Sequence, residues 1–369
     1  MKKIGLISHL NYPLLSVTVL LITVGLAFIY SASYQITIET NAQINYSSKQ
    51  VVWSVIGIIC FVAILLYGYD RIMKLSYLIY IANILLLILV FVIGATRYGS
   101  ERWIQVGGLV LQPSEFAKIM VIITLSKYLS MNLQNYRSIW FLLKAMILTF
   151  FPMVLILRQP DLGTSLVFIP IFFTMVFVAG TPLKHLLLLI GTGITAVPFF
   201  WFFLLKDYQK NRIRVFWDPN LDPAGLGYQA IQSKITVGSG GLFGKGWLHG
   251  TQNQLNFLPK RYTDFIFSVI GEEWGFLGVS FVLLLYFLLI IIGIYIASKS
   301  KDSFGKLLAC GISVMILAHV IINVGMTIGI MPITGLPLLF LSYGGSSMLT
   351  AIISVALLES IWVKRKYDY

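Results

Sequence analysis

Long apolar runs separated by short polar connections occupy most of the chain. The runs lie near residues 14–30, 50–67, 75–95, 114–131, 139–157, 163–180, 183–204, 265–297, 305–330 and 338–362. Each run approaches or exceeds the roughly 20 residues that a helix needs to cross a bilayer. The pattern therefore predicts an all-α, polytopic integral membrane protein with about ten transmembrane helices.

The first apolar run imitates a signal peptide, because two lysines precede it and Ser31, Ala32 and Ser33 follow it as a candidate cleavage site. The run is longer than the usual apolar region of such a peptide, and further spans follow it. We therefore expect an uncleaved first span and one transmembrane domain over residues 1–369.

The distribution of Lys and Arg predicts the orientation of the chain. With the N-terminus inside, the short inside connections hold thirteen basic residues and the short outside connections hold four, which are Lys49, Arg97, Arg102 and Arg158. Membrane proteins collect basic residues on the cytoplasmic side. An even number of spans then places both termini in the cytoplasm, and residues 205–264 form one large extracytoplasmic loop.

With Asp264 at its end left out, that loop carries eight basic residues against three aspartates, a surplus of five positive charges. Long loops are exempt from the orientation rule. A basic surface on this side favours an anionic ligand. Solvation of the loop, or contact with lipid headgroups, is an equally good interpretation of the same charges.

The composition agrees with a membrane protein, since 58% of the residues are hydrophobic and 11% are charged. Soluble domains carry about a quarter charged residues. The net charge of +13 does not by itself indicate nucleic acid, and no nucleic-acid partner is expected. Cys60 and Cys310 both lie inside apolar runs and form no recognisable disulfide framework.

The junction between the large loop and the next apolar run concentrates charge. It holds two cations and three carboxylates, which are Lys260, Arg261, Asp264, Glu272 and Glu273. On a helix, Asp264, Ser268, Gly271 and Gly275 would share one face, and we expect this stripe to face a protein-lined cavity. The alternative is a solvated helix start with Asp264 near the positive end of the dipole, which explains the two glutamates poorly.

Two further polar patches should lie on the same side of the membrane. The first patch comprises residues 99–104, which include Arg102, followed by residues 112–118. In its second part, Glu115 and Lys118 are three residues apart on one helical face and close enough to pair. An ion pair within a span is either a functional site or a structural pair, and function is the default hypothesis. Residues 105–111 are too short to span, which indicates a re-entrant or interfacial piece.

The second patch is the short connection at residues 158–164, which contains Asp161. Its carboxylate either belongs to a site or caps the following helix.

Several other motifs are excluded. Lys245 follows a glycine-rich stretch at residues 238–250, but Gly246 stands where a phosphate loop needs Ser or Thr; a flexible loop with backbone amides near a phosphate stays open as an alternative. The four histidines are scattered and form no zinc pattern; His319 is interpreted as a hydrogen-bonded core residue. No Gly-x-Ser-x-Gly nucleophile motif occurs.

Carboxylates and cations at a lipid–water boundary suit glycosyl transfer from a lipid diphosphate. The attacking hydroxyl needs a base, and the leaving diphosphate needs counter-charge. One carboxylate with Arg and Lys would therefore suffice, in contrast to the two carboxylates of glycoside hydrolases.

Taken together, the motifs at residues 99–104, 112–118, 159–164, 238–252, 258–273, 323–337 and 341–347 resemble the SEDS family (shape, elongation, division and sporulation). The resemblance covers nearly the whole chain. Residues 232–235 and 244–252 are more similar to the elongation branch of the family than to its division branch.

This resemblance implies a peptidoglycan glycosyltransferase that polymerises lipid II during elongation at the outer face of the bacterial cytoplasmic membrane. By motif, Asp264 is the catalytic residue, the base for the acceptor's 4-hydroxyl. Attack with inversion would give a β-1,4 link and release undecaprenyl diphosphate. Glu115 and Lys118 match positions that matter in the family.

We add Arg102, Lys260, Arg261 and Asp161 to the substrate-binding residues, the three cations because of their charge and side. The implied partners are a class B penicillin-binding transpeptidase and other membrane proteins of the elongation complex. A divalent cation, Mg or Mn, is plausible for some members, but the sequence contains no ligand cluster, and no metal ligand is predicted.

Two functions of other classes remain open. A transporter that flips the lipid-linked precursor would benefit from polar groups through the full depth of the bilayer, whereas the charges here cluster toward one side. A non-catalytic scaffold of the elongation machinery would not need Asp264 at a cavity.

Overall fold

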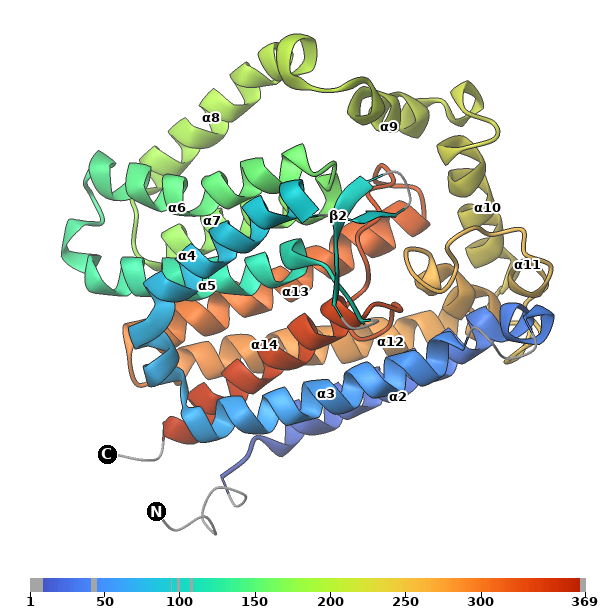
Figure 1. The fold of residues 1–369 in the computed structure, drawn as a ribbon, viewed down its shortest axis with the longest axis horizontal. Coiled ribbons are helices and arrows are strands. Elements are labelled where there is room, and N and C mark those ends of the chain that lie inside the picture. The colour runs from blue at the N-terminus through green and yellow to red at the C-terminus, as the bar shows by residue number, and fades with distance from the viewer. Residues whose placement is uncertain (1–8, 41–44, 94, 98–99, 107–108, 366–369) are drawn as a thin grey trace.

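The structure is a computed structural model that describes residues 9–40, 45–93, 95–97, 100–106 and 109–365. Within these ranges, ten long helices follow the ten predicted apolar runs, so the all-α polytopic fold is confirmed (Figure 1). They are α2 (Tyr12–Glu39), α3 (Tyr46–Tyr67), α4 (Tyr69–Ile93), α5 (Pro113–Met131), α6 (Ile139–Arg158), α7 (Leu162–Val178), α8 (Leu183–Phe199), α12 (Ile266–Ser298), α13 (Ser303–Thr327) and α14 (Gly345–Lys364).

Eight of the described helices are long and apolar enough to cross a bilayer by themselves. The other two, α5 and α7, lie largely inside the protein, where neighbouring helices cover them. The short 3-10 helix η1 (Leu133–Asn135) joins α5 to α6. The last span begins later than predicted: residues 328–344 are not helical, and Phe340, at φ +69°, interrupts the predicted run.

The N-terminal end of α2 and the C-terminal end of α14 lie at the same end of the bundle, as Figure 1 shows. The backbone N–H of Asn11, before α2, donates to the Glu359 carboxylate near the end of α14 at 2.6 Å. Because an even number of spans separates these residues, the two ends of the described chain meet on one side.

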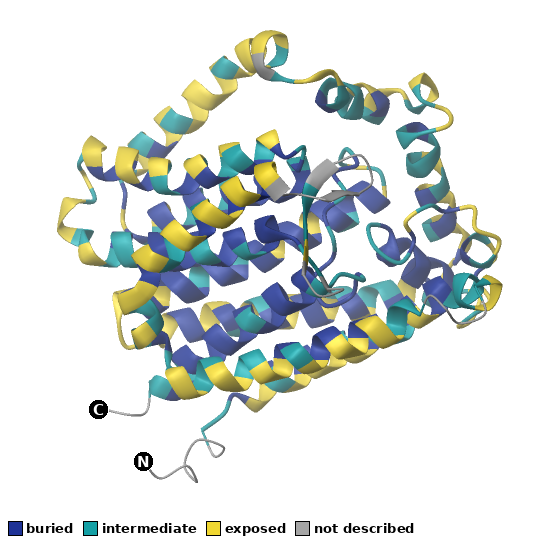
Figure 2. Cartoon of the chain, viewed as in Figure 1, coloured by how far each residue is buried: buried dark blue, intermediate teal, exposed yellow. Residues whose placement is uncertain are grey.

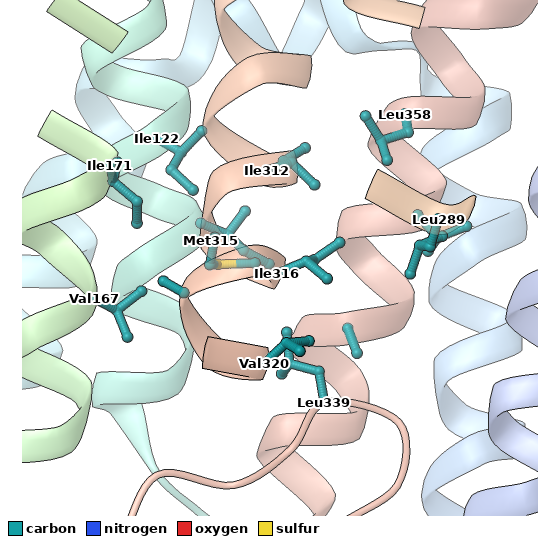
Figure 3. Close-up of a cluster of buried hydrophobic side chains, with 14 of the residues drawn as sticks. Ile122, Val167, Ile171, Leu289, Ile312, Met315, Ile316, Val320, Leu339 and Leu358 are labelled. Atoms are coloured by element: carbon teal, nitrogen blue, oxygen red, sulfur yellow. The ribbon is translucent and has the colours of Figure 1, made fainter. Parts of the chain in front are cut away.

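The hydrophobic core is centred on α13, which packs against α5, α7, α12 and α14 (Figure 2). In Figure 3, Ile312, Met315, Ile316 and Val320 of α13 lie among side chains from the neighbouring helices and from Leu339 of the connection before α14. Helices α3, α4 and α8 expose many apolar side chains, as expected for surfaces that face lipid.

A small antiparallel sheet of three strands, β1 (Ala95–Arg97), β2 (Ser100–Val106) and β3 (Leu109–Leu111), precedes α5. Of residues 105–111, expected as a re-entrant or interfacial piece, the structure describes 105–106, at the end of β2, and 109–111, which form β3. These two segments pair with each other, for example Gln105 with Val110. Pairing satisfies the backbone of a segment that is too short to form a spanning helix.

The predicted loop at 205–264 is largely helical. It contains α9 (Asp207–Trp217), the 3-10 turn η3 (Pro219–Leu221), α10 (Leu226–Ser239) and α11 (Thr251–Gln254). The short π-helix η2 (Phe200–Leu204) links it to α8, which stands apart from the bundle in Figure 1. Leu186 alone is buried in α8, all of which is described.

The prediction that a small-residue stripe on α12 faces a cavity is wrong. Ser268 Oγ lies 2.8 Å from Ser233 Oγ of α10. A Cβ added at Gly240 would fall 1.9 Å from the carbonyl oxygen of Gly271. Gly275, at φ +64° and ψ −161°, interrupts the helix against the backbone of Gly244. The absence of side chains here lets α10 and the following glycine-rich loop pack directly on α12.

Candidate functional site

Asp264 lies in the turn immediately before α12 and not within the helix. Its carbonyl accepts a hydrogen bond from the Asn323 side-chain amide at 2.9 Å, and the same amide donates to the Leu336 carbonyl at 2.8 Å. Asn323, in α13, therefore fixes the turn against the connection before α14. The Asp264 side chain keeps 16% of its surface exposed, so a substrate can reach it.

Positive charge surrounds this carboxylate. Lys260 Nζ lies 3.9 Å from Asp264 Oδ2, and the lysine side chain is 47% exposed. Burial raises the pKa of the Asp264 carboxyl from its ordinary value of 3.8, and the charges of Lys260, Arg102 and Arg212 oppose this rise without cancelling it. A carboxylate with a raised pKa is a better general base at neutral pH.

Arg102, from β2, meets Asp161 at the start of α7, with Nη1 3.3 Å from Oδ1. Asp161 Oδ2 also accepts from Gln112 Nε2 at 2.8 Å and from Ser114 Oγ at 2.9 Å. Asp161 caps α7 as well, because Oδ1 accepts from the Thr164 N–H at 3.2 Å. The capping interpretation of Asp161 is therefore confirmed, its place in a substrate site stays a prediction, and the patches around 102–118 and 158–164 do meet.

Arg212 and Tyr208, on α9, are two further residues of the site that no sequence motif indicated. Arg212 Nη1 donates to the Ile333 carbonyl at 2.9 Å. Burial lowers the pKa of Arg212, as does the charge of Arg102, while Tyr208, Asp264 and Asp161 raise it. The Tyr208 hydroxyl is buried and has no hydrogen-bond partner among the described residues. Their spacing of four residues, which places both on one face of a helix, was the available signal.

Glu115 and Lys118 pair as predicted, with Lys118 Nζ 2.8 Å from Oε2 and side chains at most 2% exposed. Lys118 Nζ also lies 2.8 Å from His319 Nε2, and His319 Nδ1 lies 2.8 Å from the Pro337 carbonyl oxygen. Since a carbonyl only accepts, Nδ1 carries the proton and Nε2 accepts from the ammonium group. His319 is thus the hydrogen-bonded core residue that was expected, and the pair lies behind the site.

The side chain of Arg261 does not join the cations around Asp264. Its side chain points to α2, where Nε donates to the Ala32 carbonyl at 2.8 Å. Burial lowers the pKa of this guanidinium, while Tyr262 and Glu39 oppose the change. The contact indicates that Arg261 anchors the turn that carries Asp264.

The two glutamates of α12 hold the segments that pack against this helix: Glu272 bonds to the glycine-rich loop and to α11, and Glu273 bonds to α2 and α11. Glu272 Oε1 accepts from Lys245 Nζ at 2.8 Å and from the Gln252 N–H at 2.9 Å. Glu273 Oε1 accepts from Ser31 Oγ at 2.5 Å and from Asn253 Nδ2 at 3.2 Å. Both carboxylates accept hydrogen bonds from neighbouring segments of the protein. These bonds explain why two glutamates lie two turns into an apolar helix.

The fold and the site together define a polytopic helical membrane protein with a charged site at the end of the bundle opposite the chain ends. Residues 12–367 match the profile of the FtsW/RodA/SpoVE family, described as cell cycle protein. The chain belongs to this family, as its resemblance to the SEDS motifs indicated.

Individual relatives match over most of their length. The peptidoglycan glycosyltransferase RodA of Treponema pallidum (strain Nichols) is 37% identical over 96% of this chain and 98% of its own. The peptidoglycan glycosyltransferase MrdB of Escherichia coli (strain K12) is 41% identical over 78% of each chain. A solved chain from a peptidoglycan synthase complex has a TM-score of 0.83 and 32% identity, and the match covers 97% of this chain and 99% of that one.

Proposed function

We propose that this protein polymerises lipid II into β-1,4-linked glycan strands during cell elongation. The expected enzyme class, a glycosyltransferase, is confirmed by relatives that are named peptidoglycan glycosyltransferases. The observation that carries the finer proposal is the Asp264 carboxylate, partly exposed and with its pKa raised, beside the cations of Lys260, Arg102 and Arg212.

In the proposed reaction, Asp264 accepts the proton of the acceptor's 4-hydroxyl as that oxygen attacks the anomeric carbon of the donor. Attack comes from the face opposite the diphosphate and inverts the α-linked centre to β. The bond between the anomeric carbon and the diphosphate oxygen breaks, and undecaprenyl diphosphate leaves with the electron pair. A positioned base contributes about 10²–10⁴-fold to the rate.

The cations stabilise the charge that develops on the leaving diphosphate. Arg102 is held by Asp161 and Arg212 by the Ile333 carbonyl, so both are oriented before substrate binds. The Tyr208 hydroxyl supplies a further donor on the same side. Glu115 and Lys118 do not contact the substrate; through His319 and the Pro337 carbonyl they support the backbone beside Asp264. Arg261, first expected among the substrate ligands, is assigned to fixing the turn.

A divalent cation, Mg or Mn, would bind here through the substrate. The described residues contain no group of three His, Cys, Asp or Glu side chains that could hold an ion. Mg²⁺ is usually bound by one or two carboxylates together with substrate phosphates. Asp264 is the carboxylate that could join a diphosphate in such a site.

The orientation of the chain follows from the charge bias. The ends of the described chain meet on one side of the bundle, and Asp264 lies at the other. Thirteen basic residues in short connections against four favour chain ends in the cytoplasm and, with them, a site that faces outside a bacterial cytoplasmic membrane. The proposed partners there are a class B penicillin-binding transpeptidase and other elongation-complex proteins, in line with the similarity to a chain of a peptidoglycan synthase complex.

The test is polymerisation of lipid II by the purified protein in detergent, where no leaflets exist to flip between. We expect glycan polymer from the wild type and none from a folded Asp264→Ala variant. Asp207→Asn, which alters an exposed carboxylate at the start of α9, is the matched control and should retain activity. Absence of polymer even with the partner transpeptidase would favour a transporter or a scaffold.

A further inference from the structure

A cavity of about 250 Å³ lies at the end of the bundle that carries the chain ends. It is formed where η1 and the connection to α6, the end of α7 and the start of α13 meet, and its lining consists of Leu133, Tyr136, Val178, Ala179, Ser303, Lys306 and Leu307. Seventeen helical residues separate Lys306 from Asn323, the partner of Asp264, which is about 25 Å at 1.5 Å per residue. The cavity is therefore separate from the catalytic site.

Two cations border this cavity. Lys306 is exposed, and none of the ion pairs among the described residues includes it. Arg137 Nε donates to the hydroxyl of the lining residue Tyr136 at 3.1 Å, which holds a guanidinium at the rim. The carboxylate of Asp302 is turned to other donors, the Tyr69 hydroxyl at 2.7 Å and the Gly305 N–H at 2.6 Å. The cavity thus offers positive charge to a ligand.

The walls and the flanking surface are apolar. Leu133, Val178 and Leu307 line the cavity. Trp140, in the first turn of α6, is 70% exposed, and Phe177, next to Val178, is 58% exposed. Trp side chains are enriched at membrane–water interfaces. A ligand with an anionic head and an apolar body would satisfy both features.

We propose that this cavity binds an anionic phospholipid. The phosphate lies at Lys306 and Arg137, the glycerol region enters the cavity, and the acyl chains follow the exposed apolar surface of α6. A volume of 250 Å³ corresponds to about eight waters at 30 Å³ each. This volume can hold the glycerol region of a phospholipid but not a whole lipid molecule. Basic pockets between spans on the cytoplasmic side are known to suit such headgroups.

The test is retention of lipid by the purified full-length protein, counted by native mass spectrometry in detergent with phosphatidylglycerol or phosphatidylcholine. We expect the wild type to retain one phosphatidylglycerol and to lose phosphatidylcholine. Lys306→Ala and Arg137→Ala should each weaken retention about five-fold, the effect of one cation at a membrane surface. Lys299→Ala is the control, since Lys299 lies over the Tyr295 ring at the same end but does not line the cavity.

A second variant, Ala179→Leu, fills the cavity while leaving both cations in place, and should also weaken retention. Equal retention by the wild type, Lys306→Ala and Arg137→Ala would overturn the proposal, as would equal retention of phosphatidylcholine. Glycerol 3-phosphate tests a soluble occupant: displacement of the lipid by millimolar glycerol 3-phosphate would identify a free-phosphate site and also overturn it. None of these readouts depends on glycosyl transfer.

Discussion

The ammonium group of Lys118 lies 2.8 Å from Nε2 of His319, at the centre of a buried chain of hydrogen bonds. The chain runs from the Glu115 carboxylate through Lys118 and His319 to the Pro337 carbonyl. Two residues before Pro337, a Cβ added at Gly335 would meet Asp264 Oδ2 at 3.4 Å. A charge pair inside the bundle is thereby connected to the backbone that flanks the proposed base.

Removing the cation of this chain should strongly destabilise the protein. Lys118→Met leaves the Glu115 carboxylate buried without its partner, which costs about 3–5 kcal/mol for pairs of this kind. The double variant Glu115→Gln/Lys118→Met removes both charges and should lose less. SDS titration in mixed micelles measures the unfolding midpoints. Ser126→Ala is the control, because that buried hydroxyl bonds within its own helix; a double variant as unstable as the single one would contradict the prediction.

The pH profile of polymerisation should report the Asp264 carboxyl. The base acts when deprotonated, and burial raises its pKa above 3.8, so activity should fall as the pH drops through a value above 3.8. Lys260 lowers this pKa, so Lys260→Met should move the acid limb of kcat/KM to higher pH. Lys245→Met, which removes the partner of Glu272, should leave the limb in place. An unmoved limb in Lys260→Met would show that another group titrates.

Substitution of three buried or half-buried arginines should have two different effects, a loss of activity for Arg102 and Arg212 and a loss of stability for Arg261. Arg102→Met and Arg212→Met remove charge beside the diphosphate and should each lower kcat/KM by about 10²–10³-fold, as for other groups that stabilise developing charge. Arg261→Met instead removes the bond to Ala32 and should mainly lower thermal stability. Initial rates and melting temperatures on the same preparations test this division. A large kinetic loss with unchanged stability in Arg261→Met would return that residue to the substrate ligands.

The space beside Asp264 can be tested with a pair of glycines. Gly335 and Gly68 both have positive φ, +75° and +82°, so alanine is strained at either position. An added Cβ meets Asp264 Oδ2 at 3.4 Å in the first case and nothing within 4 Å in the second. Both variants should lose similar stability, whereas Gly335→Ala alone should lower kcat. Equal kinetic loss in the two variants would mean that backbone strain, and not proximity to Asp264, is responsible.

Much of the fold could be predicted from the sequence, because a span is a local property. The ten helices follow from runs of apolar residues, and the even number of spans predicts that the chain ends meet. The site region was predicted for the same reason, since Asp264, Glu115 and Asp161 are charged residues at the boundaries of apolar runs. Local patterns also gave two wrong predictions. Residues 338–344 are apolar but not helical, and the small-residue stripe on α12 faces α10 and not a cavity.

Only the tertiary structure decided which charges act together. Arg212 and Arg261 are the same residue type and belong to the same loop, yet Arg212 donates to the Ile333 carbonyl and Arg261 to the Ala32 carbonyl of α2. His319 reaches Lys118 across 201 positions of sequence. Hydropathy and periodicity determine where each helix begins and which face is apolar. They do not determine which neighbour a long side chain meets, because that depends on how helices distant in sequence pack.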